Sequence, residues 1–153
     1  MFNEVVYLGN MVRNPVQLKS ALDKCTAYAV NKMADEVKKK IEEFVEYYYS
    51  EYNPIQYERT LKFLNSVTRT EVKKVGNEWQ AEVYIDLSIA YDNNWTMRGT
   101  AESANQGMHG WYHPGMTSGI HFWDMAMEEI MSPEFMNKFA GFLKSKGLKV
   151  TIR

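Results

Sequence analysis

The sequence contains a single cysteine, Cys25, among its 153 residues. One thiol cannot close an intrachain disulfide bond, so a secreted scaffold held together by disulfides is excluded. Side-chain packing must therefore stabilise the fold, and a reducing interior such as cytosol is the easier environment.

Long apolar runs are also missing. No stretch approaches the ~18 consecutive apolar residues that a membrane-spanning helix needs. The N-terminal residues lack the basic segment and the apolar run of a signal peptide. We therefore expect a soluble chain with no targeting segment and no membrane partner.

The chain has no excess of charge of either sign. Eighteen Lys and Arg residues face nineteen Asp and Glu residues, which gives a net charge of −1. Nucleic acid or anionic lipid would have to bind a local basic patch. Lys38–Lys40 is the candidate, but Glu36, Glu42 and Glu43 surround it and screen its field. We expect a solvated helix face without specific nucleic-acid binding, and a nucleic-acid-binding accessory protein is the alternative.

Aromatic residues and methionines are abundant. Phe, Trp and Tyr make up 14% of the chain, and there are ten Met. Such side chains are enriched in interfaces, although an aromatic-rich core is the commoner explanation. The length predicts a single domain over residues 1–153, large enough to bury a core.

A long amphipathic helix is predicted from Pro15 to about Tyr49. Asn14 suits the N-cap, Pro15 suits the first helical position, and Gln17 stands at the capping-box position. Apolar side chains then recur every three or four residues, which is the period of one helix face. They are Leu18, Leu22, Cys25, Ala29, Met33, Val37, Ile41, Phe44, Val45 and Tyr48. Pro54 marks the break after this helix.

An antiparallel hairpin is predicted next. Residues 67–75 and 78–90 flank Gly76-Asn77, a pair typical of two-residue hairpin turns. Apolar and polar residues alternate from Trp79 to Ile89, which predicts one buried face. Residues 148–152 alternate in the same way and predict a final strand that joins this sheet.

The remaining segments complete the predicted architecture. Residues 1–13 form an N-terminal arm or strand, a short helix lies within residues 57–66, and residues 92–119 form a long aromatic and glycine-rich loop without a period. Residues 120–131 are predicted to be helical. Ser132-Pro133 begins another helix, which Gly147 ends. The fold class is α+β, with a long N-terminal helix packed on an antiparallel sheet, C-terminal helices and a final strand.

The three histidines lie in or beside the long loop. His109, His113 and His121, with Asp124 nearby, have zinc-ligand chemistry, so a small metal-dependent hydrolase is the alternative function. Their spacing matches no established metal motif, and a triad of Ser118, His121 and Asp124 lacks a nucleophile-elbow sequence. No phosphate-binding glycine motif occurs. We therefore expect no catalytic activity, no bound metal and no cofactor.

The same loop offers a candidate interaction surface. Large apolar side chains on a loop are costly unless a partner covers them, although the loop could equally fold back onto its own domain. Arg59 is a candidate for an intersubunit or core-edge ion pair, or else a surface residue that covers Tyr57. The partner-binding candidates are Arg59, Trp95, Trp111, Tyr112, His113, Phe122 and Trp123.

The order of these features carries a family resemblance. The long helix ends in Tyr48-Tyr49, and the elements Tyr52-Asn53-Pro54, Tyr57-Glu58-Arg59-Thr60 and Leu64-Asn65-Ser66 follow it. The Gly/His/Pro loop then leads through Phe122 into Ala126 and a C-terminal helix. From about Leu18 onward, the chain resembles the tail-component and tail-completion (head–tail joining) proteins of long-tailed bacteriophages.

This resemblance implies a non-enzymatic virion protein. Such a protein would be a ring-forming tail terminator or tail-completion factor that caps the tail tube. Its implied partners are further copies of itself, in a hexamer, together with the tail tube protein and a neck or head-completion protein. Its implied location is the tail or neck of the virion, and the host cytoplasm during assembly. Ring assembly requires two different complementary patches on each subunit.

Overall fold

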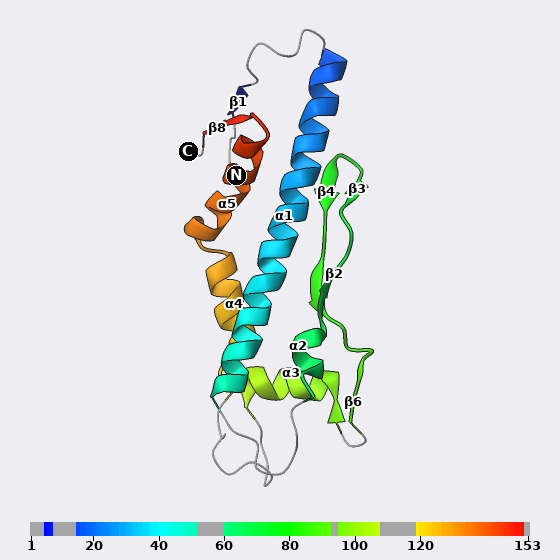
Figure 1. Cartoon of the computed structure of the whole chain (residues 1–153), viewed down its shortest axis with the longest axis vertical. Coiled ribbons are helices and arrows are strands. Elements are labelled where there is room, and N and C mark those ends of the chain that lie inside the picture. The colour runs from blue at the N-terminus through cyan, green and yellow to red at the C-terminus, as the bar shows by residue number, and fades with distance from the viewer. Residues whose placement is uncertain (1–4, 8–14, 52–59, 93–94, 108–118, 152–153) are drawn as a thin grey trace. The chain divides into compact units, whose positions relative to one another are not determined.

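The computed structural model of the chain describes residues 5–7, 15–51, 60–92, 95–107 and 119–151 (Figure 1). The chain divides into two compact units. Unit 1 comprises Met1–Glu36, Thr70–Glu82 and Met131–Arg153, and unit 2 comprises Val37–Arg69 and Val83–Ile130. The single domain predicted from the length stays a prediction.

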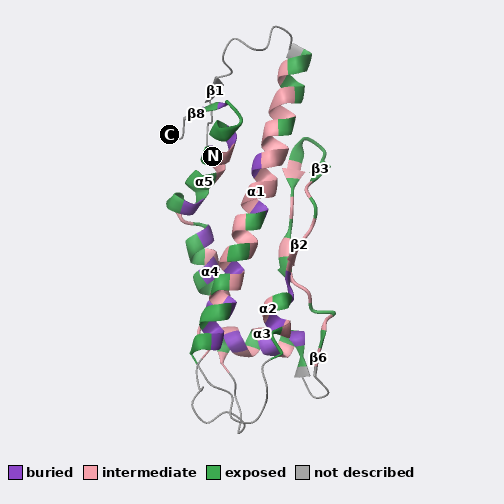
Figure 2. Ribbon diagram, in the orientation of Figure 1, coloured by how far each residue is buried: buried purple, intermediate pink, exposed green. Residues whose placement is uncertain are grey.

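The predicted long helix is confirmed as α1, which runs from Pro15 to Ser50 and contributes to both units (Figure 1). Its predicted apolar stripe includes Ala29, Ile41 and Val45, all of which are buried. Figure 2 shows buried, half-buried and exposed residues alternating along α1. Lys39 lies on the exposed side of the helix. The helix therefore forms because one face is buried, while Asn14, the predicted N-cap, lies outside the described residues.

Unit 1 contains two antiparallel strand pairs. β1 (Val5–Tyr7) pairs with the final strand β8 (Lys149–Thr151). β3 (Lys73–Val75) pairs with β4 (Glu78–Gln80) across the predicted turn, and Gly76 has a φ of 61°. That backbone conformation favours glycine, which explains why the Gly-Asn pair predicted the hairpin.

Helix α5 (Pro133–Ser145) is also part of unit 1, and both of its predicted ends are confirmed. The Ser132 hydroxyl accepts a hydrogen bond from the Phe135 amide at 3.2 Å. At the other end Gly147 has a φ of 86°, and the Leu148 amide donates to the Leu143 carbonyl at 3.3 Å. This bond and the positive φ are those of a Schellman cap.

The core of unit 1 joins these elements to the first half of α1. It consists of Ala29, Ala140, Leu143, Leu148 and Val150. The half-buried Cys25 packs against this cluster, as its place on the apolar stripe predicted. Its thiol therefore fills space beside the core.

Unit 2 begins with the short helix α2 (Lys62–Asn65), followed by β2 (Val67–Arg69), which pairs with β5 (Val83–Ile85). β6 (Ala90–Asp92) pairs with β7 (Trp95–Thr96). Helices α3 (Met97–Gln106) and α4 (Phe122–Ile130) complete the unit.

The single sheet predicted from the sequence is wrong, because the described strands form four separate two-stranded pairs. The predicted alternation holds from Trp79 to Ile85 and then fails, since Leu87 is 45% exposed. There the Asp86 carboxylate accepts hydrogen bonds from the Ser88 amide at 2.9 Å and the Ser88 hydroxyl at 2.6 Å. Side-chain bonding of this kind turns the chain away from an extended strand.

The predicted loop over residues 92–119 is wrong where it includes α3. Thr96 caps this helix by accepting a hydrogen bond from the Gly99 amide at 3.0 Å. Met97, Thr100 and Ala104 form its buried side. The apolar stripe is made largely of small residues, so packing decides the structure where hydrophobic periodicity is weak.

Within the described residues, the predicted helix over residues 57–66 is found only from Lys62 to Asn65, as α2, and residues 57–59 lie outside the described part of the chain. Leu61 has a left-handed φ of 57° and is exposed, so it does not extend an apolar helix face. None of the described helices is both long and apolar enough to cross a membrane.

Candidate partner-binding site

The structure places two of the predicted partner-binding residues together. Phe122 and Trp123 form the first turn of α4. The backbone of Trp95 lies in β7, but its side chain is outside the described part of the structure. Arg59, Trp111, Tyr112 and His113 also lie outside the described residues. The partner-binding roles of all seven candidates stay predictions.

Asn105 on α3 fixes the beginning of α4. Its side-chain oxygen accepts a hydrogen bond from the Trp123 amide at 3.0 Å, and its side-chain nitrogen donates to an Asp124 carboxylate oxygen at 3.2 Å. Its backbone oxygen accepts from the His121 amide at 3.0 Å. One residue thus satisfies two amides near the α4 N-terminus and holds its first acidic side chain.

Gly119 is necessary for this close approach of the chain to α3. A Cβ atom at Gly119 would lie 2.3 Å from the backbone oxygen of Asn105. No rotation of a side chain can relieve a clash with backbone, so only glycine fits here. Residue 119 must therefore be glycine for the chain to pass this close to the backbone of Asn105.

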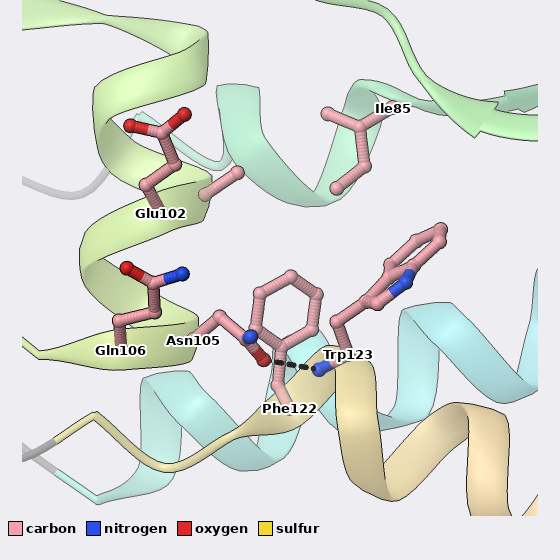
Figure 3. Close-up of a pocket in the computed structure, with 7 residues that line it drawn as sticks. Ile85, Glu102, Asn105, Gln106, Phe122 and Trp123 are labelled. Carbon is pink, nitrogen blue, oxygen red and sulfur yellow. Dashed lines mark hydrogen bonds between the residues drawn. The ribbon is translucent and has the colours of Figure 1, made fainter.

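A shallow groove of about 160 Å³ opens between α3, α4 and β5. We call it the Trp123 groove. Glu102 and Gln106 flank it on α3, while Ile85 and the indole of Trp123 stand on the other side, with the ring of Phe122 between them (Figure 3). Its lining residues are Ile85, Ala101, Glu102, Asn105, Gln106, Phe122 and Trp123. Its volume and largely apolar lining suit one large side chain of a partner.

An aromatic cluster makes the floor of the groove. Phe122 is only 1% exposed, and its ring centroid lies 5.4 Å from that of the fully buried Phe63 in an edge-to-face contact. Phe63 in turn meets the rings of Tyr48 and Tyr49 edge to face. Edge-to-face packing of this kind stabilises the floor. Phe122 is thus mainly a core residue, whereas Trp123 is half-buried and contributes to the surface.

The electrostatics of this part of unit 2 are acidic. Glu102 lines the groove and is exposed, and its only described ion pair is with Arg98 at 3.7 Å. Asp124 and Glu128 lie on the exposed side of α4. A cationic or polar partner surface therefore suits this rim.

The three lysines of the predicted basic run all have acidic partners. Lys38 pairs with Glu42, and Lys39 lies 4.0 Å from Glu43. Lys40 contacts both Glu129 at 2.8 Å and Glu43 at 2.5 Å. Hydrogen bonds to Glu129 and then Glu43 raise the pKa of Lys40 above its usual value. The predicted solvated helix face holds for Lys39, which is exposed, whereas Lys38 and Lys40 are half-buried.

Of His109, His113, His121 and Asp124, the structure describes only His121 and Asp124, and these two side chains lie close together. The Nδ1 atom of His121 lies 3.3 Å from an Asp124 carboxylate oxygen, and both side chains are exposed. Among the described residues, no group of three or more His, Cys, Asp or Glu side chains could hold a metal ion. His109, His113 and Ser118 lie outside those residues.

Several groove residues were missed by sequence reasoning because they belong to α3. Ala101, Glu102, Asn105 and Gln106 were treated as part of a loop. The signal that could have found them is the capping residue Thr96, followed by buried residues at positions 97, 100 and 104.

Comparison with known protein families identifies the family of the chain. Residues 14–145, which include all the groove residues, match the YomN family. The chain belongs to the YomN family. YomN is a phage-derived family named after a gene of a Bacillus phage, so the match indicates a phage protein. No curated protein and no solved structure matches the chain.

Proposed function

We propose that this YomN-family chain is a structural protein of the phage particle that acts at the head–tail junction. In this proposal it forms a ring on the end of the tail tube, as a tail terminator or tail-completion protein, and contacts the neck. The observation that carries the proposal is an open groove, floored by an aromatic cluster and flanked by Trp123, in a chain of a phage-derived family.

Other exposed features of unit 2 support a role in assembly. Tyr84 and Leu87 are large apolar side chains with more than two fifths of their surface exposed, and Met125 on α4 is also exposed. β2 and β5 pair only with each other among the described strands, so each offers an outer edge. Exposed apolar side chains and open strand edges are the kinds of surface that protein partners cover.

The test is genetic complementation with electron microscopy. A phage or prophage that encodes this chain is deprived of its gene, and particles are examined with and without the chain supplied in trans. The proposal predicts separate filled heads and tails without the chain, and joined particles with it. Normal joined particles in its absence would contradict the proposal.

A matched pair of variants connects this test to the groove. Trp123→Ala removes the half-buried indole beside the groove, whereas Tyr47→Ala removes an exposed aromatic side chain from α1. We expect Trp123→Ala to reduce the yield of joined particles while Tyr47→Ala supports assembly. Thermal unfolding of both purified variants shows whether each is folded.

A further inference from the structure

We infer that the Trp123 groove binds helix α5 of a second copy of this chain, with Trp123 packed over Gly141 of that copy. The inference rests on the proposed function, because it specifies how copies of the chain contact one another. Its basis is complementarity of charge and of shape between two surfaces that belong to different units of the chain.

The charge complementarity is visible in the sequence. Residues 83–130, which supply the whole lining of the groove, include six Asp and Glu but one Arg. Residues 131–153, which include α5, contain five Lys and Arg but one Glu. Two surfaces of opposite charge attract each other, and like surfaces are kept apart.

Side chains on both surfaces are available for pairing. On α5, Lys144 is exposed and has no ion-pair partner among the described residues. On α4, Glu128 is exposed and likewise has no described partner. Glu102 at the groove has only the 3.7 Å contact with Arg98. Forming ion pairs between copies would therefore break few of the ion pairs that the described residues already make.

The shape complementarity centres on Gly141. This glycine lies in the interior of α5 and is exposed, and a Cβ atom placed on it meets no atom within 4 Å. Glycine destabilises a helix interior by roughly 0.5–1 kcal/mol relative to alanine, so the position is not optimised for helix stability. Lys138 and Lys144 lie three residues before and after it. Lys138 is paired with Glu36 of its own chain at 2.5 Å, whereas Lys144 has no described ion-pair partner.

A flat patch beside Lys144 fits the indole of Trp123 at the acidic rim of the groove. Trp123 is half-buried, and the groove beside it has room for one large side chain. Large aromatic anchors that pack against a closely approaching backbone are typical of interface hot spots. Lys144 of one copy would then face the acidic rim of the other.

This contact is heterologous, because each copy uses one surface as donor and a different surface as acceptor. Repetition of a heterologous contact produces a closed ring or an open filament. Each copy in such an assembly has its groove covered by one neighbour and its α5 covered by the other. A two-fold dimer would instead use the same surface on both copies.

The test uses two variants that each block one surface. Glu102→Lys reverses the charge at the groove, and Gly141→Glu adds an acidic side chain to α5 at a position with open space. Glu78→Lys on β4 and Ser20→Glu on α1 are matched controls at exposed positions that belong neither to the groove lining nor to α5. Sedimentation velocity measures association of the 17.9 kDa chain over a range of concentrations.

The wild-type chain and both controls should self-associate beyond a dimer. Each blocking variant alone should self-associate at least about tenfold more weakly than the wild-type chain. When the two blocking variants are mixed, each retains one intact surface, so a one-to-one dimer should appear. Native mass spectrometry of a mixture with one isotope-labelled partner identifies that heterodimer.

Three results would overturn the inference. The first is that the wild-type chain stays monomeric up to about 1 mM. The second is that the blocking variants self-associate as strongly as the controls. The third is that the mixture of the two blocking variants forms no heterodimer. Circular dichroism excludes misfolding as the cause of lost association. The complementation test of the proposed function is independent, since joined particles could depend on the chain even if copies meet through other surfaces.

Discussion

The same substitution at two glycines of α5 should change stability in opposite directions. Gly141 lies in the helix interior, whereas Gly147 lies just after the helix with a φ of 86°. A Cβ atom would meet nothing within 4 Å at either position, so steric clashes with neighbouring atoms do not contribute. The difference must come from the backbone alone.

The magnitudes follow from the conformational preferences of glycine and alanine. Gly141→Ala should raise the free energy of unfolding by about 0.5–1 kcal/mol, because alanine is the better residue in a helix interior. Gly147→Ala should lower it by roughly 1–2 kcal/mol, because alanine disfavours the left-handed conformation. The Schellman hydrogen bonds at the end of α5 would be strained in the second variant.

The assay is urea unfolding followed by circular dichroism, at a concentration low enough to keep the chain monomeric. The expected result is a higher midpoint for Gly141→Ala and a lower one for Gly147→Ala, with unchanged slopes. A loss of stability in Gly141→Ala would refute the reasoning, since the position would then be crowded or not helical. An unchanged midpoint in Gly147→Ala would refute the cap at the end of α5.

Three further predictions concern the core, a helix cap and one carboxyl group. Phe63→Ala should lower the free energy of unfolding by about 3–5 kcal/mol, because Phe63 is fully buried; a loss below 1 kcal/mol in denaturant unfolding would contradict this. Ser132→Ala should cost about 1 kcal/mol by removing the acceptor of the Phe135 amide, whereas Ser132→Asp should retain most of the stability. Hydrogen bonds from the Ser88 side chain and then from the Ser88 amide lower the pKa of Asp86. The ionised carboxylate therefore stabilises the fold above its unfolded-state pKa. This contribution is lost as the pH falls through the folded-state pKa. Ser88→Ala should move the pKa of Asp86 upward in a carbon-detected NMR titration, and an unchanged titration would show that the hydroxyl bond is absent in solution.

The helices were predictable where the sequence contains both a cap and a regular apolar face. Pro15 at the start of α1 and Ser132 before α5 are local signals, and Gly147 ends α5 for a local reason. The Gly76 hairpin turn was equally predictable, because its positive φ restricts the residue type. Each of these features depends on neighbours close in sequence.

The features that escaped prediction depend on distant contacts. Helix α3 buries the small side chains Thr100 and Ala104, which leave a weak periodic signal. Asn105 organises the start of α4 only because the fold brings it to Trp123 and Asp124. The Trp123 groove was therefore half predictable: its α4 residues were singled out as aromatic candidates, and its α3 side became visible only in the structure.

We propose that this YomN-family chain is a structural part of the phage particle. The most direct measurement is quantitative mass spectrometry of purified tailed particles from the phage or prophage that encodes the chain. Our account predicts that the chain is present at a fixed, small copy number per particle and remains after extensive washing. Its absence from particles that are otherwise complete would contradict the account.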